Sequence, residues 1–206
     1  QHYGAKNNKL VSIGVHTAIT FSLIVGIIVS IFGAIFSKAM LANMNVPDNI
    51  MSMALPYLQI YFIGLAPNLI YNMGAGLLRA VGDSRTPLIF LIISCFVNIV
   101  LDIILIQYMN MGVTGAAIAT VASQIISAIL VIIVLSRRDD ALKLRLSNLG
   151  INFSELRKMI SIGVAAGMQS AMYTIANILI QASINSLGTD TIAAFTAYGK
   201  IDTLFW

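Results

Sequence analysis

Two polar residues in the long apolar run 93–104 are the first candidates for chemistry. Asn98 and Asp102 are four residues apart, so on a helix their side chains leave the same face. A carboxylate inside a membrane is costly unless it holds a proton, binds a cation or finds a partner. The pair therefore favours a site for a small cation or a proton. Hydrogen bonding between helices explains the same pair equally well from these residues alone.

A third candidate, Thr120, lies in the next apolar run. Asp102 lies a few residues before the end of its span, and Thr120 lies a few residues after the start of the next. At 1.5 Å per residue, both are therefore roughly 10 Å inside the membrane surface at which the two spans are joined. Carboxylate, amide and hydroxyl oxygens are hard ligands that suit Na⁺, or a proton held on Asp102. Small residues spaced by four, Gly115 with Ala119 and Ala116 with Thr120, would let two helices approach closely, although generic membrane packing explains them too.

A polar stripe marks a later apolar run, in which every fourth residue is polar: Gln169, Tyr173, Asn177, Gln181 and Asn185. A polar stripe on a membrane helix faces protein or water rather than lipid. We therefore predict that the first four of these residues line a substrate cavity, with interhelical hydrogen bonding as the equal alternative for any one of them. Three polar residues of an earlier span allow the same two interpretations: Gln59, Asn68 and Asn72.

These candidates must be positioned by membrane-spanning helices. The chain is 58% hydrophobic and 10% charged, whereas a soluble domain has about 25% charged residues. Its apolar runs are long enough for helices to cross a bilayer and do not alternate as the strands of a barrel would. The expected fold class is therefore all-α, a polytopic transmembrane helix bundle.

Five complete spans and the start of a sixth are predicted, at about residues 10–41, 50–78, 88–108, 113–135 and 160–187, and after 190. Pro67 should kink the second span, whereas Pro87 suits the first turn of the third. The polar linker 137–158 should carry a short surface helix at 153–159. We expect it to divide the amino-lobe part, 1–136, from the start of a carboxy lobe, 159–206. Lys200 and Asp202 lie in the sixth span and do not share a helix face.

The orientation follows from the basic residues. Alternate loops, beginning with the N-terminal one, contain ten of them, and the opposite loops contain only Lys38. The ten are Lys6, Lys9, Arg79, Arg85, Arg137, Arg138, Lys143, Arg145, Arg157 and Lys158. Because basic loops stay inside, segments 1–9, 79–87 and 137–158 are predicted to face the cytoplasm.

Several function classes are disfavoured by the same residues. The histidines, His2 and His16, have no serine or cysteine placed beside them as a nucleophile, so we do not expect an enzyme. No Walker-type phosphate loop is present, and the basic residues are divided among loops, which argues against ATP hydrolysis and nucleic-acid binding. The single cysteine, Cys95, excludes an intrachain disulfide.

Three segments together resemble the MATE (multidrug and toxic compound extrusion) family: 78–87, 98–102 and 112–120. The first carries the RAxGDxRTP loop motif, formed here by Arg79, Gly82, Asp83, Arg85, Thr86 and Pro87. The opening residues 3–7 look like the loop after the second helix of that family. The resemblance implies helices three to seven and the start of helix eight of a two-lobe, twelve-helix transporter, so we expect the chain to be an internal fragment of a longer protein.

The resemblance also implies a function. It predicts multidrug efflux by antiport, in which an inward H⁺ or Na⁺ gradient drives export of cationic amphipathic drugs by alternating access. In the prokaryotic DinF-like branch, a cation site uses an Asn and an Asp four apart and a Thr on the next helix, which fall here on Asn98, Asp102 and Thr120. That site also takes an Asp from the first helix, which lies outside this chain. The expected setting is a prokaryotic plasma (inner) membrane, with a monomeric full-length protein and no cofactor besides the coupling ion.

A lipid-linked oligosaccharide or lipid flippase is the alternative function within the same superfamily. Its cavity must accept an anionic pyrophosphate and should therefore contain several Arg or Lys residues within the spans. Besides Lys38, which is counted with the opposite loops at the end of the first span, only Lys200 is seen within a predicted span, and this disfavours the alternative.

Overall fold

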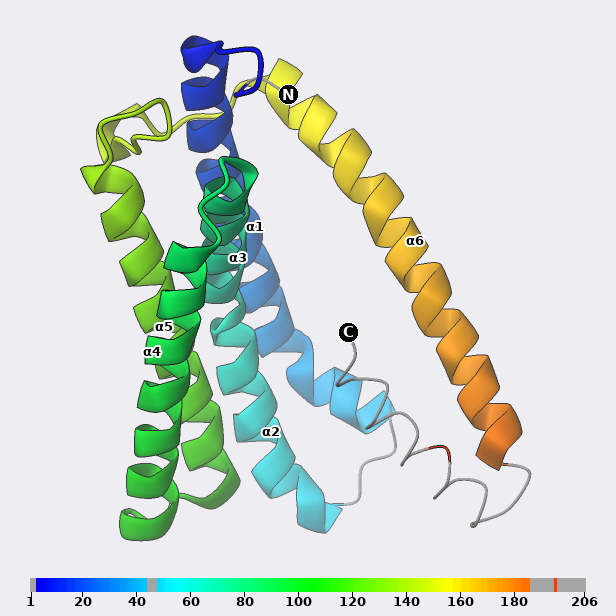
Figure 1. Ribbon diagram of the computed structural model, residues 1–206. Coiled ribbons are helices and arrows are strands. Elements are labelled where there is room, and N and C mark those ends of the chain that lie inside the picture. The colour runs from blue at the N-terminus through cyan, green and yellow to red at the C-terminus, as the bar shows by residue number, and fades with distance from the viewer. Residues whose placement is uncertain (1–2, 44–47, 186–194, 196–206) are drawn as a thin grey trace. The chain divides into compact units, whose positions relative to one another are not determined.

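The computed structural model describes residues 3–43, 48–185 and 195 and places nearly all of them in helices (Figure 1). By contact density the chain divides into two compact units, Gln1–Leu156 and Arg157–Trp206, each of which is described by itself. The predicted all-helical class is confirmed for the described residues. The predicted sixth span, apart from Phe195, and with it Lys200 and Asp202, lies outside them. The division into amino lobe, linker and carboxy lobe stays a prediction.

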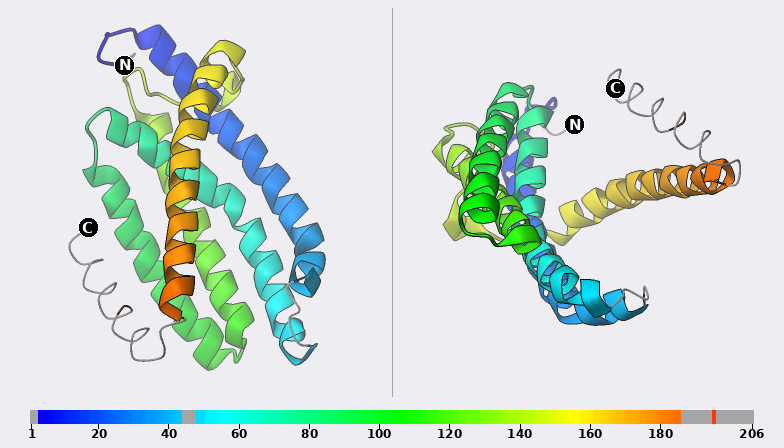
Figure 2. Two further views of the ribbon diagram at one scale, coloured as in Figure 1. Left: turned by 90° about the vertical axis from the view of Figure 1, so that its right-hand side faces the viewer. Right: turned by 90° about the horizontal axis from the view of Figure 1, so that it is seen from below.

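The elements follow one another along the chain as α1 (Asn8–Asn43), α2 (Asp48–Ile63), α3 (Leu65–Ala80), α4 (Arg85–Asp102), the π-helix η1 (Ile103–Tyr108), α5 (Gly112–Arg137), the 3₁₀ turn η2 (Leu146–Asn148) and α6 (Phe153–Asn185). In the first unit α1 packs against α2 and α3, and α5 packs against α2, α3 and α4 (Figure 2).

Five helical segments of the described chain are long and apolar enough to cross a membrane, in agreement with the five predicted complete spans: Asn8–Asn43, Ile50–Ala80, Arg85–Tyr108, Gly112–Arg137 and Phe153–Ile180. Large apolar side chains on their outer faces are exposed, such as Ile35 at 68% and Phe96 at 69%. Such faces are stable against lipid and would be unfavourable in water. The first unit is therefore a multi-pass helix bundle.

The second span is interrupted at Gly64, three residues before the predicted kink at Pro67. Because proline has no N–H, Pro67 cannot donate to the carbonyl oxygen of Ile63, one turn earlier. The hydroxyl of Ser30 on α1 approaches that oxygen instead, at 3.5 Å. Gly64 also allows α5 to approach, because a Cβ there would lie 2.6 Å from Cγ2 of Val121.

The α3–α4 loop and the start of α4 follow the prediction, with Pro87 in the first turn of the helix. Gly82 adopts φ +88°, which glycine tolerates and larger residues rarely do. Asp83 then caps α4: one carboxylate oxygen accepts the backbone N–H of Thr86 at 3.1 Å, and the other accepts its hydroxyl at 2.9 Å. A side-chain acceptor at this point satisfies a backbone donor that the helix itself leaves unpaired.

The linker after α5 packs closely against the helix ends. Leu142 and Leu144 are only 1% and 2% exposed. They join a buried cluster with residues of four helices: Val15, Ile19, Leu78, Phe90, Val131 and Leu135. Leu142 and Leu144 of the linker thus cover the ends of these four helices on one side of the bundle.

The separate surface helix predicted at 153–159 is wrong, because α6 begins at Phe153 and continues without a break to Asn185. The start is set by Asn152, whose side-chain oxygen accepts the backbone N–H groups of Ser154 at 3.1 Å and Glu155 at 3.2 Å. No proline interrupts the chain between 153 and 185, so the helix has no reason to end at Met159.

The α4–α5 hairpin differs from the regular helix pair that we expected. α4 ends at Asp102, and the chain continues as the π-helix η1. Its last turn is closed by the N–H of Met109, which donates to the carbonyl oxygen of Ile104 at 3.0 Å. The predicted turn at 110–112 is confirmed, with Asn110 at φ +53° and Gly112 at φ +54°.

Candidate cation and substrate site

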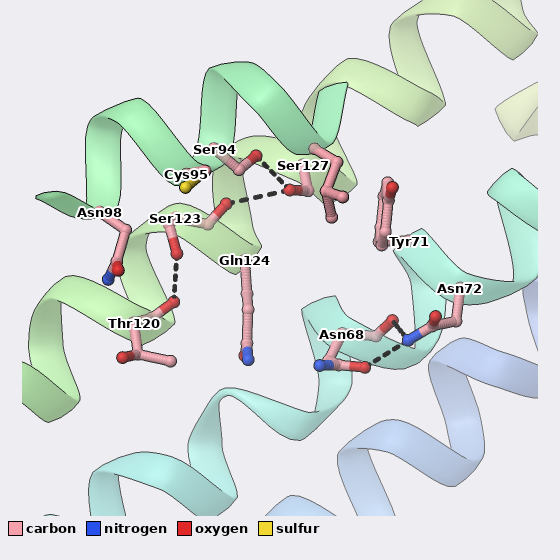
Figure 3. Close-up of a pocket in the computed structure, with 11 residues that line it drawn as sticks. Asn68, Tyr71, Asn72, Ser94, Cys95, Asn98, Thr120, Ser123, Gln124 and Ser127 are labelled. Atoms are coloured by element: carbon pink, nitrogen blue, oxygen red, sulfur yellow. Dashed lines mark hydrogen bonds between the residues drawn. The ribbon is translucent and has the colours of Figure 1, made fainter. Parts of the chain in front are cut away.

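A cavity of about 510 Å³ opens between α3, α4 and α5 in the first unit (Figure 3). Most of the residues that line it are polar but uncharged. The lining residues are Asn68, Tyr71 and Asn72 from α3, Leu91, Ser94, Cys95 and Asn98 from α4, and Thr120, Ser123, Gln124 and Ser127 from α5. The cavity therefore offers amide and hydroxyl groups and no fixed charge of its own.

Two of the three predicted cation-site residues are brought together here. Asn98 and Thr120 reach the same cavity from α4 and α5, and Figure 3 shows their side chains at the same end of it. The hydroxyl of Thr120 donates to the carbonyl oxygen of Ala116 at 2.9 Å. Because its proton is used in this bond, its oxygen remains available as an acceptor or as a ligand to a cation.

Asp102, the third predicted residue, does not line this cavity. It is half-buried at the end of α4, one turn beyond Asn98. Its Oδ1 atom is buried and has no hydrogen-bond partner among the described residues. Since a buried carboxylate oxygen without a partner is costly, this atom is suited to hold a proton or a cation.

Sequence reasoning missed the serines and the glutamine of the cavity. Ser94 of α4 and Ser127 of α5 hydrogen-bond to each other through their hydroxyls across the helix pair. Gln124 lines the cavity one turn after Thr120. The signal was present in α5, because residues 120, 123, 124 and 127 have the spacing of one helix face.

Of the polar residues in the second span, some line the cavity and one forms a hydrogen bond between helices. Asn68 and Asn72 line the cavity and hydrogen-bond to each other, with the amide of Asn72 as donor. Gln59 instead donates to the carbonyl oxygen of Ala34 at 3.4 Å and so connects α2 to α1. Tyr71, which was not predicted, lines the cavity and donates to the carbonyl oxygen of Pro87 at 3.1 Å.

The predicted substrate stripe lies on α6, in the second unit. Gln169, Tyr173 and Asn177 have exposed side chains there, and Tyr173 is 71% exposed. Gln181 belongs to the same helix, but its side chain lies outside the described residues. The role of these four residues in substrate binding stays a prediction.

The RAxGDxRTP motif connects the start of α4 to the linker after α5. Asp83 caps α4 and also pairs with Arg138 of the linker, Nη1 to Oδ2, at 3.4 Å. The backbone N–H of Thr86 lowers the pKa of the Asp83 carboxyl below its ordinary value, and the Thr86 hydroxyl and Arg138 lower it further, against a partial opposing effect of desolvation. Arg79 of the motif donates to the carbonyl oxygen of Ala75 at 3.3 Å.

The chain is similar to known proteins along its whole length. It is 28% identical over 208 residues to the probable multidrug resistance protein YoeA of Bacillus subtilis (strain 168), which covers 98% of this chain and 45% of YoeA. It is 30% identical over 176 residues to the probable multidrug resistance protein YpnP of the same strain, covering 84% of this chain and 38% of YpnP. The chain thus spans less than half the length of these relatives.

A solved structure has the same fold. An outward-facing multidrug resistance MATE transporter of the MOP superfamily matches with a TM-score of 0.88 and 24% identity, over 98% of this chain and 46% of that one. The family model described as MatE matches residues 1–104, which include the loop motif, Asn98 and Asp102. The resemblance seen in the loop motif and the α4 and α5 segments is therefore confirmed: the chain belongs to the MatE family.

Proposed function

We propose that the protein to which this chain belongs is a secondary active transporter, not an enzyme, and that it exports cationic amphipathic compounds by alternating access. An inward gradient of H⁺ or Na⁺ would drive the export by antiport. The observation that carries the proposal is the buried, unpartnered carboxylate oxygen of Asp102 one turn from the cavity that Asn98 and Thr120 share. Membership of the MatE family supports transport.

The coupling cation would be held by Asn98, Asp102 and Thr120. The amide carbonyl of Asn98 and the hydroxyl oxygen of Thr120 supply neutral ligands, and Asp102 supplies the negative charge. When Asp102 takes up a proton or Na⁺, a buried charge is neutralised. That change favours whichever conformation buries the group more completely, and it thus couples ion binding to the movement of the helices.

The substrate would enter the cavity of the first unit. Its volume of about 510 Å³ lies within the range of roughly 300–1,000 Å³ that is usual for small-molecule sites. Uncharged amide and hydroxyl groups suit varied amphipathic compounds, because they bind polar groups without demanding one arrangement of charge. On α6, Gln169, Tyr173, Asn177 and Gln181 remain our candidates for further substrate contacts, supported by their spacing along the helix.

The proposed setting is the inner membrane of a prokaryote, with segments 1–9, 79–87 and 137–158 in the cytoplasm. The basic residues support this orientation. The ion pair between Asp83 and Arg138 supports it further, because it joins two of the three segments at one end of the bundle. We expect the full-length protein to act as a monomer.

The alternative, a lipid-linked oligosaccharide or lipid flippase, requires cationic groups that bind a pyrophosphate within the membrane. Among the described residues, the cavity lining contains no Arg or Lys. The basic residues of the described spans lie near span ends, at Lys9, Lys38, Arg79, Arg85, Arg137, Arg157 and Lys158. Export of cationic compounds is therefore favoured.

The test uses the full-length protein expressed in cells that lack their own drug pumps. We would measure accumulation of a fluorescent cationic dye with and without a protonophore, and in the presence and absence of Na⁺. Export that requires one of the two gradients supports the proposal and identifies the coupling ion. Gradient-independent retention of the dye, together with movement of a labelled lipid-linked sugar in vesicles, would instead support the flippase.

A further inference from the structure

The π-helix η1 begins directly after Asp102 and is the most unusual backbone feature of the described chain. A π-helix closes its hydrogen bonds over five residues instead of four, as between Met109 N–H and the carbonyl oxygen of Ile104 at 3.0 Å. Short π segments are rare and frequently occur at functional sites. This segment separates α4 from the tight turn that leads into α5.

α5 accommodates this segment at Gly115, which is buried against it. A Cβ added at Gly115 would lie 3.1 Å from Cβ of Leu105 and 3.1 Å from Cβ of Met111. It would also lie 3.3 Å from the backbone carbonyl carbon of Leu105. These distances are shorter than ordinary carbon contacts, so either the helix or the π segment would have to move. The absence of a side chain at Gly115 therefore allows η1 to lie where it does.

The position of η1 affects which way Asp102 faces. A π turn contains about one residue more than an α turn, and one residue corresponds to a rotation of roughly 100° about a helix axis. The turn at 110–112 is fixed to the start of α5. If the number of residues per turn in η1 changed, the side chain of Asp102, which directly precedes η1, would therefore be the first to rotate about the helix axis. Asn98, one turn further from η1, lines the cavity in the present arrangement.

We propose that η1, seated against Gly115 of α5, positions the carboxylate of Asp102, and that Gly115 and Leu105 are positioning residues for exchange of the coupling ion. This inference rests on the proposed function of Asp102. Neither Gly115 nor Leu105 lines the cavity, so they would act only through the backbone that carries the carboxylate. Loosening this contact opens the surroundings of Oδ1 to water while the rest of the bundle stays folded.

The first measurement is independent of transport. In the purified full-length protein, the apolar reagent dicyclohexylcarbodiimide modifies carboxyl groups that are shielded from water, and peptide mass spectrometry reads the labelling of Asp102. Gly115→Ala and Leu105→Ala should each lower the labelling rate by about threefold or more, because each hydrates the carboxyl group. Asp102→Asn identifies the labelled peptide.

Two matched variants separate positioning from general damage. Gly74→Ala places a methyl group 2.6 Å from Cγ2 of Val131, a closer contact than at Gly115 but between α3 and α5 and not at η1. Ile104→Ala shortens a neighbouring side chain of η1 that is 42% exposed. Both should leave the labelling of Asp102 unchanged. If Gly115→Ala fails to reach the membrane, Leu105→Ala still decides, because it keeps the Cβ that faces Gly115 and removes only the rest of a half-buried side chain of η1.

The second measurement is the dependence of dye export on pH or Na⁺ in the same variants. Gly115→Ala and Leu105→Ala should shift the ion dependence, whereas Gly74→Ala should lower export uniformly at all ion concentrations. Wild-type labelling in both Gly115→Ala and Leu105→Ala would overturn the inference. If labelling falls but Asp102→Asn exports dye normally, the proposed coupling role of Asp102 fails while the effect of η1 on the carboxylate stands.

Discussion

Two carboxylates flank α4 and have opposite surroundings. Asp83, just before the helix, accepts hydrogen bonds from the N–H and hydroxyl of Thr86 and pairs with Arg138. Asp102, the last residue of the helix, has a buried oxygen with no partner in the described chain. Hydrogen-bond donors and a basic side chain thus surround the first carboxylate, whereas no donor in the described chain reaches Oδ1 of the second. The donors within reach therefore give Asp83 a structural role, and they leave at Asp102 a buried oxygen that the proposed ion exchange would use.

The backbone explains much of this difference. At the start of a helix, N–H groups are free to donate to a carboxylate, and the helix dipole favours negative charge. Further along a helix these N–H groups already donate to backbone carbonyl oxygens. The N–H of Ile103, for example, donates to the carbonyl oxygens of Ile99 and Val100. Asp102 must therefore find its partner in another helix, an ion or a proton.

The largest expected effect comes from comparing Asp102→Asn with Asp83→Asn. In the full-length protein, Asp102→Asn should lower gradient-driven dye export by about tenfold or more, since an amide cannot exchange a proton or balance Na⁺. Asp83→Asn should leave the dependence of export on the ion gradient intact. The measurement is export per amount of protein in the membrane. Normal export by Asp102→Asn would remove this residue from the coupling mechanism.

A large effect on stability is expected where the linker is buried. Leu144→Ala removes a side chain that is 2% exposed and packs on the ends of α1, α3, α4 and α5. It should lower the free energy of unfolding by about 2–4 kcal/mol, because a cavity forms in place of the side chain. Leu146→Ala is the control, since Leu146 is 63% exposed. Thermal unfolding in detergent measures both, and equal effects would show that the linker is not packed as described.

Much of this architecture could be predicted from the sequence. Long apolar runs specify spans, because a backbone in lipid must satisfy its own hydrogen bonds. Pro87 in the first turn of α4 and the turn at 110–112 also followed from local chemistry. The spacing of Asn98 and Asp102 correctly placed both residues on α4, one turn apart. Thr120 was expected to approach Asp102, but it shares the cavity with Asn98, and Asp102 does not line that cavity.

Features that depend on contacts between distant residues could not be predicted. Nothing in segment 103–108 distinguishes a π-helix from an α-helix, and Gly115, against which this segment lies, belongs to the next helix. The docking of Leu142 and Leu144 depends on a space between four helix ends. Pro67 indicated the break near Gly64 through its missing N–H, but the close approach of Val121, which Gly64 allows, depends on a distant helix.

A smaller effect on stability should distinguish Asp83, which caps α4, from the neighbouring Ser84. Asp83→Ala removes an acceptor for the Thr86 N–H and the partner of Arg138, and should lower the free energy of unfolding by about 1–2 kcal/mol. Ser84→Ala is the matched control, because Ser84 occupies the cap position but makes no side-chain capping bond. It should change stability by less than about 0.5 kcal/mol. Equal losses in the two variants would contradict the capping role of Asp83.

The smallest effect is the pH dependence that the same carboxylate produces. Because the N–H of Thr86 lowers the pKa of Asp83 in the folded protein, the unfolded chain binds the proton more readily. The resulting stabilisation is fully present above the ordinary pKa of an aspartate and is lost as the pH falls through the lowered value. The difference in unfolding temperature between wild type and Asp83→Asn should therefore be constant near neutral pH and shrink in strong acid. A difference that grew on acidification would mean that Asp83 is not held in its charged form, and its contrast with Asp102 would disappear.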